Sequence, residues 1–385
     1  MAVNDKIFTG EYKVGILGGG QLGQMMIQAG ISYNIAFHIL DPSAEAPCRN
    51  LCERFVQGDF NDFDTVYKFG QSVDLITIEI EHVNVDALEK LESEGKAVYP
   101  SPKTLRIIKD KGLQKQFYQE HNIPTSPFHL IDSRADIKDF IDFLPAAQKL
   151  RTGGYDGKGV SIIDAGNYID NSFDAPSVLE QKVDIDKELS FVVARNASGE
   201  TKAFPAVELV FHPEYNLVEH LFSPAAISAE IEKEGEAIAM KLANELELVG
   251  LLAVEMFLDK EGKLIVNEVA PRPHNSGHQT IEGNITSQFE QHLRAILDLP
   301  LGATDTIESS VMVNLLGAEG YTGPAVYDGM DKLLHQHGVF PHLYGKAVTK
   351  PGRKMGHVTI INQDLDKALE TAEFVKQSIR VISNQ

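Results

Sequence analysis

The sequence predicts a protein of several domains, in which a parallel α/β domain is followed by an α+β domain and a small C-terminal domain. The chain has 385 residues, of which 43% are hydrophobic, and this is enough to form two or three separate cores. Strand-like and helix-like segments alternate over about the first 100 residues, which is typical of a parallel sheet covered by helices. From Ala146 onward, short strands around glycine-rich turns replace this alternation.

The N-terminal elements follow from apolar runs separated by amphipathic segments. A helix is expected at Gln21–Ala29, and apolar strands are expected at Lys13–Leu17, Ile35–Leu40 and Val73–Ile78. Ligands of parallel sheets bind at the carboxyl ends of the strands. The loops after these three strands are therefore the first places to look for a site.

The middle region reads as an α+β domain, in which one long helix interrupts short strands. The dipeptides Ser101-Pro102 and Ile123-Pro124 bracket helical segments that join the first two domains. Strands are expected at Ser190–Ala194, Thr201–Val207, Leu251–Leu258 and Lys263–Val269, with helices at Ala229–Glu247 and, near the C-terminus, Leu365–Ile379. We place the domains at residues 1–110, 111–310 and 311–385, with a lid subdomain at about 124–190.

Composition excludes several classes of protein. A net charge of −20 would repel nucleic acids and anionic membranes, so neither is expected as a partner. No apolar run has the length of a membrane span, and the N-terminus lacks the apolar core of a signal peptide. The two cysteines, Cys48 and Cys52, are too few for a disulfide framework. A cytoplasmic protein is expected, and any anionic substrate must be bound by a local basic cluster.

The first motif is Gly18-Gly19-Gly20-Gln21-Leu22-Gly23, which follows a predicted strand and opens a predicted helix. Glycines let backbone amides approach a phosphate, and the helix N-terminus favours negative charge. By itself the motif predicts a nicotinamide-dependent dehydrogenase, with Asp41 placed for a ribose hydroxyl. A tight strand-to-helix turn, or a loop for another phosphate, would give the same pattern.

The second motif is the glycine-rich segment Gly153–Gly159, which follows Lys149 at the end of a predicted strand. Such a segment can close over a polyphosphate, and the lysine supplies a point charge for phosphate oxygens. It is not a Walker A loop, because Gly159 stands where Ser or Thr would follow Lys158. The alternative is an exposed hairpin with solvated lysines.

Two carboxylates, Glu255 and Glu268, lie within apolar segments that we read as adjacent strands. Buried carboxylates are costly unless they have a counter-ion. If the turn is Asp259–Gly262, Glu255 faces Val266, and Glu268 lies diagonally beside Glu255 on the same face. Both could then bind one Mg²⁺, which takes one or two protein carboxylates and completes its shell with water and phosphate. Two solvated glutamates on an edge hairpin remain the alternative.

The loop after this hairpin, Ala270–His278, carries one guanidinium, two imidazoles and an amide. Its two prolines restrict the backbone, so these polar groups are held in place rather than free to move. A strand end followed by such a loop is a usual place for catalytic groups. The segment is therefore a candidate site for binding or catalysis.

Five strings occur in this order along the chain: G-G-G-Q-L-G at 18–23, T-G-G-Y-D-G-K-G at 152–159, V-E-M-F at 254–257, N-E-V-A-P-R-P-H-N-S-G-H at 267–278 and G-R-K-M-G-H at 352–357. The chain thereby resembles the N5-carboxyaminoimidazole ribonucleotide synthetases, and the resemblance covers nearly its whole length. It implies an ATP-grasp fold with a Rossmann-like N-terminal domain and, usually, a homodimer. The implied reaction joins bicarbonate to the amine of aminoimidazole ribonucleotide through carboxyphosphate, and it converts ATP to ADP and phosphate in de novo purine biosynthesis.

The resemblance also implies roles for individual residues. ATP would contact Lys111, Lys149, Gly154, Tyr155, Asp156, Gly157, Lys158, Gly159, Val160, Glu180, Gln181, Lys182, Val183, Glu188, His212, Asn267 and Glu268. Mg²⁺ would be bound by Glu255 and Glu268. The ribonucleotide and bicarbonate would contact Gln21, Leu22, Glu79, Arg272, His274, Asn275, Ser276, Lys346, Arg353 and Lys354, the last two and Lys346 forming the basic cluster for the ribotide phosphate. Catalysis would involve Tyr155, Asp156, Lys158, Arg272 and His274.

The chain departs from the family pattern at Lys111, where arginine is usual, at Val160, where glutamine is usual, and in a longer segment before His212. Three other functions stay open at this point. The first is the dehydrogenase, which would bind NADH. The second is a nucleotide sensor that binds ATP without turnover, and the third is another ATP-grasp ligase such as the formate-dependent glycinamide ribonucleotide transformylase.

Overall fold

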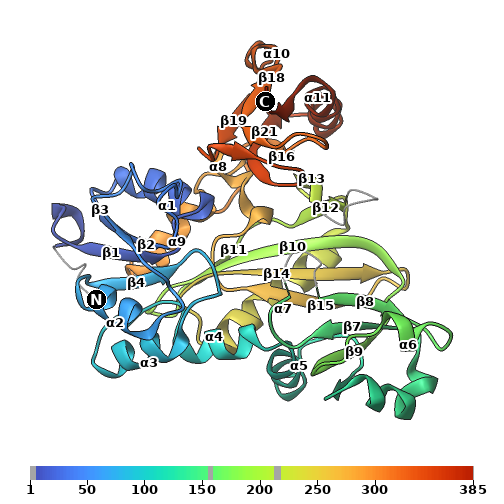
Figure 1. The fold of residues 1–385 in the computed structure, drawn as a ribbon. Helices are drawn as coiled ribbons and strands as arrows, with labels where there is room; N and C mark the ends of the chain where they lie inside the picture. Colours follow the sequence, from blue (N-terminus) through green and yellow to red (C-terminus); the bar gives the residue numbers. More distant parts are fainter. Residues whose placement is uncertain (1–5, 155–158, 212–217, 385) are drawn as a thin grey trace.

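A computed structural model describes residues 6–154, 159–211 and 218–384 (Figure 1). Its N-terminal sheet is parallel, in the order β3-β2-β1-β4-β5, so the predicted α/β class is confirmed. The strands are β1 Lys13–Leu17, β2 Ala36–Asp41, β3 Arg54–Gln57, β4 Leu75–Ile78 and β5 Ala97–Val98. They alternate with the helices α1 Gln21–Ile31, α2 Phe63–Gln71 and α3 Val85–Ser93.

Local sequence explains where these helices begin. The Asp62 carboxylate accepts from the Thr65 amide at the start of α2, and the Asn84 side chain accepts from the Ala87 amide at the start of α3. The interior residues of β1, β2 and β4 are buried, which is why these strands read as continuous apolar runs in the sequence.

A four-stranded antiparallel sheet in the order β6-β9-β7-β8 follows the helices α4 Pro102–Lys109 and α5 Lys111–Glu120. Its strands are β6 Phe128–Ile131, β7 Ala146–Leu150, β8 Val160–Ile163 and β9 Ser177–Gln181, with the 3-10 helix η2 Arg134–Phe143 and the short helix α6 Tyr168–Asn171. It has a small core of its own around Ile131, Ile137 and Leu179. Figure 1 shows this unit set apart from the N-terminal domain.

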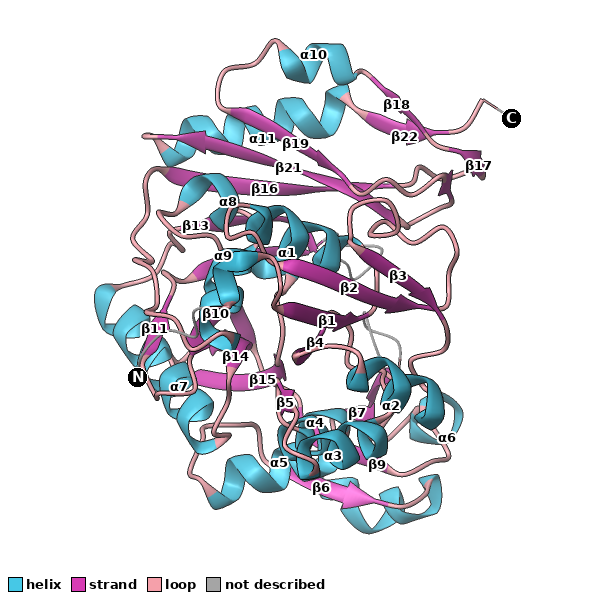
Figure 2. Cartoon of the chain, turned by 90° about the vertical axis from the view of Figure 1, so that its left-hand side faces the viewer, coloured by secondary structure: helices cyan, strands magenta, loops and turns pink. Residues whose placement is uncertain are grey.

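The largest sheet has nine strands in the order β15-β14-β10-β12-β13-β16-β21-β19, with β11 added to β10. Its strands are β10 Ile185–Arg195, β11 Thr201–Ala203, β12 Val207–Phe211, β13 Val218–Ser223, β14 Gly250–Asp259, β15 Leu264–Ala270, β16 Ser309–Leu316, β19 Val339–Leu343 and β21 Lys354–Asn362. The sheet therefore runs without a break from the middle of the chain into its C-terminal part. Figure 2 shows its last three strands, β16, β21 and β19, side by side.

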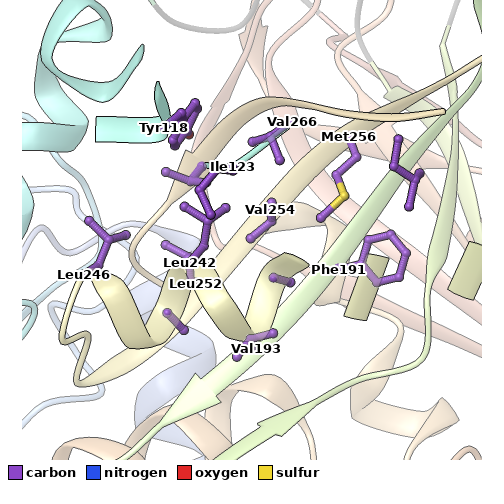
Figure 3. Packing of buried hydrophobic residues seen from close by; sticks show 14 of the residues in the cluster. Tyr118, Ile123, Phe191, Val193, Leu242, Leu246, Leu252, Val254, Met256 and Val266 are labelled. Atoms are coloured by element: carbon purple, nitrogen blue, oxygen red, sulfur yellow. The ribbon is translucent and has the colours of Figure 1, made fainter. Parts of the chain in front are cut away.

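The helix α7, Ala229–Glu245, covers one face of this sheet. Figure 3 shows Phe191, Val254 and Leu242 in the core between them. Gly235 has to be small, because a Cβ atom there would lie 2.1 Å from the Phe191 ring. Residues that are distant in sequence thus form a single core beneath the strands that carry Glu255 and Glu268.

The remaining elements are one short helix at the N-terminus and the elements that complete the C-terminal region and join it to the rest. They are η1 Ile7–Thr9, η3 Asn275–Gly277, α8 Thr280–Gly283, α9 Gln288–Ile296, α10 Met330–Leu334, α11 Leu365–Ser378 and the short strands β17 Gly323–Pro324, β18 Val326–Asp328, β20 Val348–Thr349 and β22 Arg380–Ile382. The helix α9 packs on both α1 and β14, and α11 packs on β16 and β21. Across the described ranges, none of the helices has both the length and the apolar character needed to span a bilayer.

Candidate active site

The hairpin of β14 and β15 places two carboxylates directly opposite each other. Its register begins with Leu258 opposite Leu264, and a bulge before Glu255 then adds one residue on β15. Glu255 therefore pairs with Glu268, and the predicted pairing of Glu255 with Val266 was wrong. Without the bulge, Asn267 would stand opposite Glu255. A bulge of this kind aligns the two acids, although the hairpin turn alone would not.

The two carboxylates have different electrostatic surroundings. The Lys111 ammonium lies 2.7 Å from Glu268 Oε2, and this contact lowers the pKa of Glu268. Burial raises the pKa of Glu255, and the nearby carboxylates of Glu268 and Glu188 raise it further. Burial also raises the pKa of Glu188, to about 7. The negative charges of these three acids therefore repel one another, and the nearby lysines do not fully compensate for them.

This arrangement fits a magnesium site. Two adjacent carboxylates with a third acid close by repel one another until a cation is bound between them. Nucleotide phosphates and water would have to complete the shell, because no group of three or more His, Cys, Asp or Glu side chains within the described ranges forms a metal site by itself. Glu268 has 47% of its side chain exposed and Glu255 has 18%, so a ligand can reach both.

A second charged cluster lies where β7, β9 and α5 meet. The Lys149 Nζ donates to Asn267 Oδ1 at 2.7 Å and to Glu180 Oε2 at 3.2 Å. Lys115, with 1% of its surface exposed, also contacts Glu180 Oε2, at 3.0 Å. Both ammonium groups therefore hold one carboxylate oxygen, while Glu180 Oε1 is buried without a hydrogen bond within the described residues.

The segment that continues from Glu180 borders a hollow on the surface. Gln181, Lys182 and Val183 line a cavity of about 330 Å³, together with residues of the β14–β15 turn. Of the four residues predicted to contact ATP here, Glu180 lies in the charged cluster with Lys149, whereas Gln181, Lys182 and Val183 line this separate hollow.

The glycine loop between β1 and α1 is occupied by carboxylates. The Gly19 amide donates to Asp41 Oδ2 at 2.7 Å, and the Gly23 amide donates to Glu79 Oε2 at 3.3 Å. A dinucleotide would need these amides for its pyrophosphate and Asp41 for its ribose. The loop of this chain is therefore not prepared for NAD, and the dehydrogenase alternative loses its support.

Glu79 itself lies at the carboxyl end of β4, where the sequence predicted a ligand site. A Cβ atom on Gly18 would lie 2.5 Å from Glu79 Cγ, and one on Gly20 would lie 2.8 Å from Glu79 Oε1. The glycines thus make room for this carboxylate. Gln21 is partly exposed at the start of α1, but Leu22 is buried in the core, so only its backbone can reach a ligand.

The loop after β15 brings the predicted polar groups to the same place. The Arg272 Nε lies 2.9 Å from Glu81 Oε1, in an ion pair whose angle does not make a hydrogen bond. His274 Nδ1 lies 3.8 Å from Glu255 Oε1. Burial, together with the positive charges of Arg272 and Lys354, lowers the pKa of His274 to about 3, so the ring is neutral.

The basic cluster of Lys346, Arg353 and Lys354 faces this loop. The Lys346 Nζ donates to the Lys354 carbonyl at 2.7 Å, and the Arg353 guanidinium donates to the Val348 carbonyl. Burial lowers the pKa of Lys346 to about 8, as does Arg353, whereas Glu79 raises it. Lys354 also acts on the pKa of Glu255, so the C-terminal cluster lies close to the central carboxylates.

Comparison with known proteins identifies the family. Three domain models match: the ribonucleotide synthetase preATP-grasp domain at 12–109, the ATP-grasp domain at 116–289 and the phosphoribosylaminoimidazole carboxylase C-terminal domain at 310–371. N5-carboxyaminoimidazole ribonucleotide synthase of Bacillus subtilis is 36% identical over 93% of both chains. The chain belongs to the N5-carboxyaminoimidazole ribonucleotide synthase family. The ATP-grasp fold implied by the resemblance is confirmed.

Solved structures of the family agree with this assignment. The Thermotoga maritima synthetase is 40% identical, with a TM-score of 0.89, and the match covers 97% of this chain and 100% of that one. The synthase of Aspergillus clavatus, solved in complex with ADP and 5-aminoimidazole ribonucleotide, is 29% identical with a TM-score of 0.87, covering 96% and 98%. The family's domain order and fold therefore extend over almost the whole chain.

Some residues that the family resemblance selected cannot be placed. Tyr155, Asp156, Gly157, Lys158 and His212 lie outside the described residues. Their neighbours Gly154, Gly159 and Val160 are described, and Val160 is 39% exposed at the start of β8. Asn275 is partly buried, and Ser276 is buried in the loop that follows β15.

Sequence reasoning missed Lys115 and Ser190 and left Glu81 without a role. Lys115 stands on a helix among polar residues, where a buried ammonium cannot be recognised from sequence. Ser190 is a small polar residue in an apolar strand, the one signal that could have drawn attention to it. Only the structure shows that Glu81 faces Arg272.

Proposed function

We propose that this family member carboxylates 5-aminoimidazole ribonucleotide with bicarbonate, giving N5-carboxyaminoimidazole ribonucleotide, ADP and phosphate through carboxyphosphate. The observation that carries the proposal is the pairing of Glu255 with Glu268, beside Lys111, Lys149 and the loop from Arg272 to Ser276. These groups supply a cation site, phosphate ligands and an anion site in one place.

The chemistry depends on position and charge. A bicarbonate oxygen attacks the γ-phosphorus of ATP as the bond to ADP breaks, and loss of phosphate from the product then releases CO₂ for the substrate amine, which gives up a proton. Bound Mg²⁺ would neutralise charge on the phosphates, with Glu255 and Glu268 as its protein ligands. Lys111 and Lys149 would hold phosphate oxygens, and Arg272 would hold the bicarbonate.

Water must be excluded, because carboxyphosphate decomposes quickly in it. We infer that the segment at about 124–190, with its four-stranded sheet, closes over the nucleotide. The domain limits 1–110, 111–310 and 311–385 and a homodimer in solution are part of the same proposal, as is a place in the cytoplasm.

The decisive experiment measures ADP release with ATP and Mg²⁺, in the presence and absence of bicarbonate and of aminoimidazole ribonucleotide. We expect full stimulation only when both are added, and formation of the carboxylated product in equal amount. Stimulation by formate with glycinamide ribonucleotide would instead identify another ATP-grasp ligase. ATP binding without any turnover would support the nucleotide sensor.

A further inference from the structure

A row of three side chains crosses the nine-stranded sheet beside the catalytic loop. Ser190 of β10 stands directly opposite Glu255 of β14, which stands opposite Glu268 of β15. Ser190 is fully buried, and its hydroxyl lies 2.7 Å from the Ser276 hydroxyl in the loop after β15. The Ser276 hydroxyl lies 2.9 Å from His274 Nδ1. A continuous chain thus runs from the sheet to the imidazole.

The direction of this chain follows from a backbone contact. The Ser276 amide points at His274 Nδ1 at 3.4 Å, and an amide N–H can only donate. His274 Nδ1 is therefore an acceptor and carries no proton. The Glu255 carboxylate is 3.8 Å away from it, too far to be its hydrogen-bond partner.

The two hydroxyls must then be ordered as well. Because His274 Nδ1 accepts, the Ser276 hydroxyl donates to it, and the Ser276 oxygen is left to accept from the Ser190 hydroxyl. The neutral ring consequently carries its proton on Nε2. The positive charges of Arg272 and Lys354 act on the same ring, so an anion is the ligand that this surrounding favours.

We propose that Ser190 is a positioning residue that, through Ser276, holds His274 as the Nε2–H tautomer, so that the ring gives an oxyanion substrate a hydrogen bond rather than accepting a proton from it. The oxyanion would be bicarbonate or its phosphorylated product, so this inference rests on the proposed function. His274 donates without carrying a charge, and Arg272 supplies the charge.

The loop does not need Ser190 to keep its shape. The Gln288 side chain accepts from the His274 amide at 2.9 Å and donates to the His274 carbonyl at 2.7 Å. The hydroxyl of Thr280 also donates to the Gly277 carbonyl at 2.6 Å. Removing the Ser190 hydroxyl should therefore disturb the imidazole's hydrogen-bonding partner while the backbone remains anchored.

The first test uses the unmodified protein. Long-range ¹H–¹⁵N spectra of the ¹⁵N-histidine-labelled enzyme, with His274 assigned by loss of its signals in His274→Gln, should show the proton on Nε2. This reading is made without substrate, so it does not depend on the proposed reaction. A proton on Nδ1, or a doubly protonated ring at neutral pH, would overturn the inference.

The second test is a double-mutant cycle between Ser190→Ala and Ser276→Ala. We expect Ser190→Ala to lower kcat by roughly tenfold, the value of one hydrogen bond of about 1.4 kcal/mol, with little change in the KM for ATP. Because both serines act through one ring, the double variant should be no slower than Ser276→Ala. Independent, multiplying losses would contradict the inference.

Ser223→Ala is the matched control. Ser223 is a buried serine in the same sheet whose hydroxyl contacts only the Ala206 carbonyl, at 3.3 Å, in the described structure. Both substitutions should lower the melting temperature by similar amounts, but only Ser190→Ala should change kcat and the His274 spectrum. Equal kinetic effects of the two variants would assign Ser190 a merely structural role.

Discussion

At the scale of single residues, the proposed site can be tested most directly by substitutions in the carboxylate pair. Glu255 and Glu268 are adjacent, yet Lys111 holds only Glu268. A charge held between a lysine and a cation site cannot be replaced by an amide without loss of the cation, even though the amide has the same shape.

We therefore expect Glu268→Gln to reduce kcat by at least about 100-fold, or on the order of 3 kcal/mol, while the melting temperature changes little. Glu247→Gln, at an exposed glutamate 3.8 Å from Lys103, should leave kcat unchanged. Initial rates of ADP release and circular dichroism melts of both variants check this. Near-normal turnover in Glu268→Gln would disprove the metal assignment.

The half-buried Lys346 predicts that the site depends on pH. Its pKa is lowered to about 8, so it is a cation below this pH and neutral above it. We expect kcat/KM for the ribonucleotide to fall as the pH rises through about 8, because the substrate phosphate, if Lys346 binds it as proposed, then loses one positive partner.

Arginine stays protonated over this range, so Lys346→Arg should move the fall to higher pH. The measurement is a profile of kcat/KM between pH 6.5 and about 10 for both proteins, a span set by the lysine pKa values. Identical alkaline limbs in the two profiles would show that another group titrates there.

At the scale of elements, the glycine loop is adapted to acidic side chains. Gly18 has φ +98° and leaves no room for a Cβ atom next to Glu79. The Gly19 amide donates to Asp41 and the Gly23 amide donates to Glu79. These hydrogen bonds join the turn and the start of α1 to the ends of β2 and β4.

Gly18→Ala should therefore be costly in two ways. Backbone strain at positive φ costs about 1 to 2 kcal/mol, and displacement of Glu79 adds about 1 to 3 kcal/mol. Gly95→Ala measures the backbone strain without the displacement, because Gly95 has φ +87° and no atom lies within 4 Å of its Cβ position. Urea denaturation should show the larger loss for Gly18→Ala, and equal losses would mean that Glu79 moves aside freely.

At the scale of the whole molecule, the nine-stranded sheet ties the C-terminal region to the ATP-grasp region. The residues Phe222 and Ser223 of β13 pair with Val311 and Ser310 of β16, and the apolar side chains of β16 and β21 form one core with α11. The C-terminal domain is thus not a separable attachment, because its first strand completes the sheet.

A chain that ends at residue 308 should lose far more than the basic cluster of Lys346, Arg353 and Lys354. It would leave β13 as an unpaired edge with buried side chains uncovered, and such edges aggregate. We expect this shortened chain to melt at a much lower temperature, or to precipitate, and to bind ATP poorly in calorimetry. If the shortened chain instead melts at the same temperature and binds ATP with the same affinity as the full-length chain, the C-terminal strands are not needed for the stability of the sheet.

The sequence by itself determined the parallel N-terminal sheet, the α+β character of the region that follows and the residue types of the site. Local information was sufficient for these, since apolar periodicity reports which faces are buried and glycine marks the tight turns. The family resemblance added the reaction, and it assigned roles to Lys149, Glu268 and Arg272 before any contact was known.

Only the tertiary structure decided how these groups meet. A one-residue slip or bulge changes every pairing in a hairpin, so the sequence could not place Glu255 opposite Glu268. The contacts of Lys115 with Glu180, Glu81 with Arg272 and Ser190 with Ser276 join segments that are from 65 to 191 residues apart. Such contacts depend on packing between distant elements, which no local pattern in the sequence records.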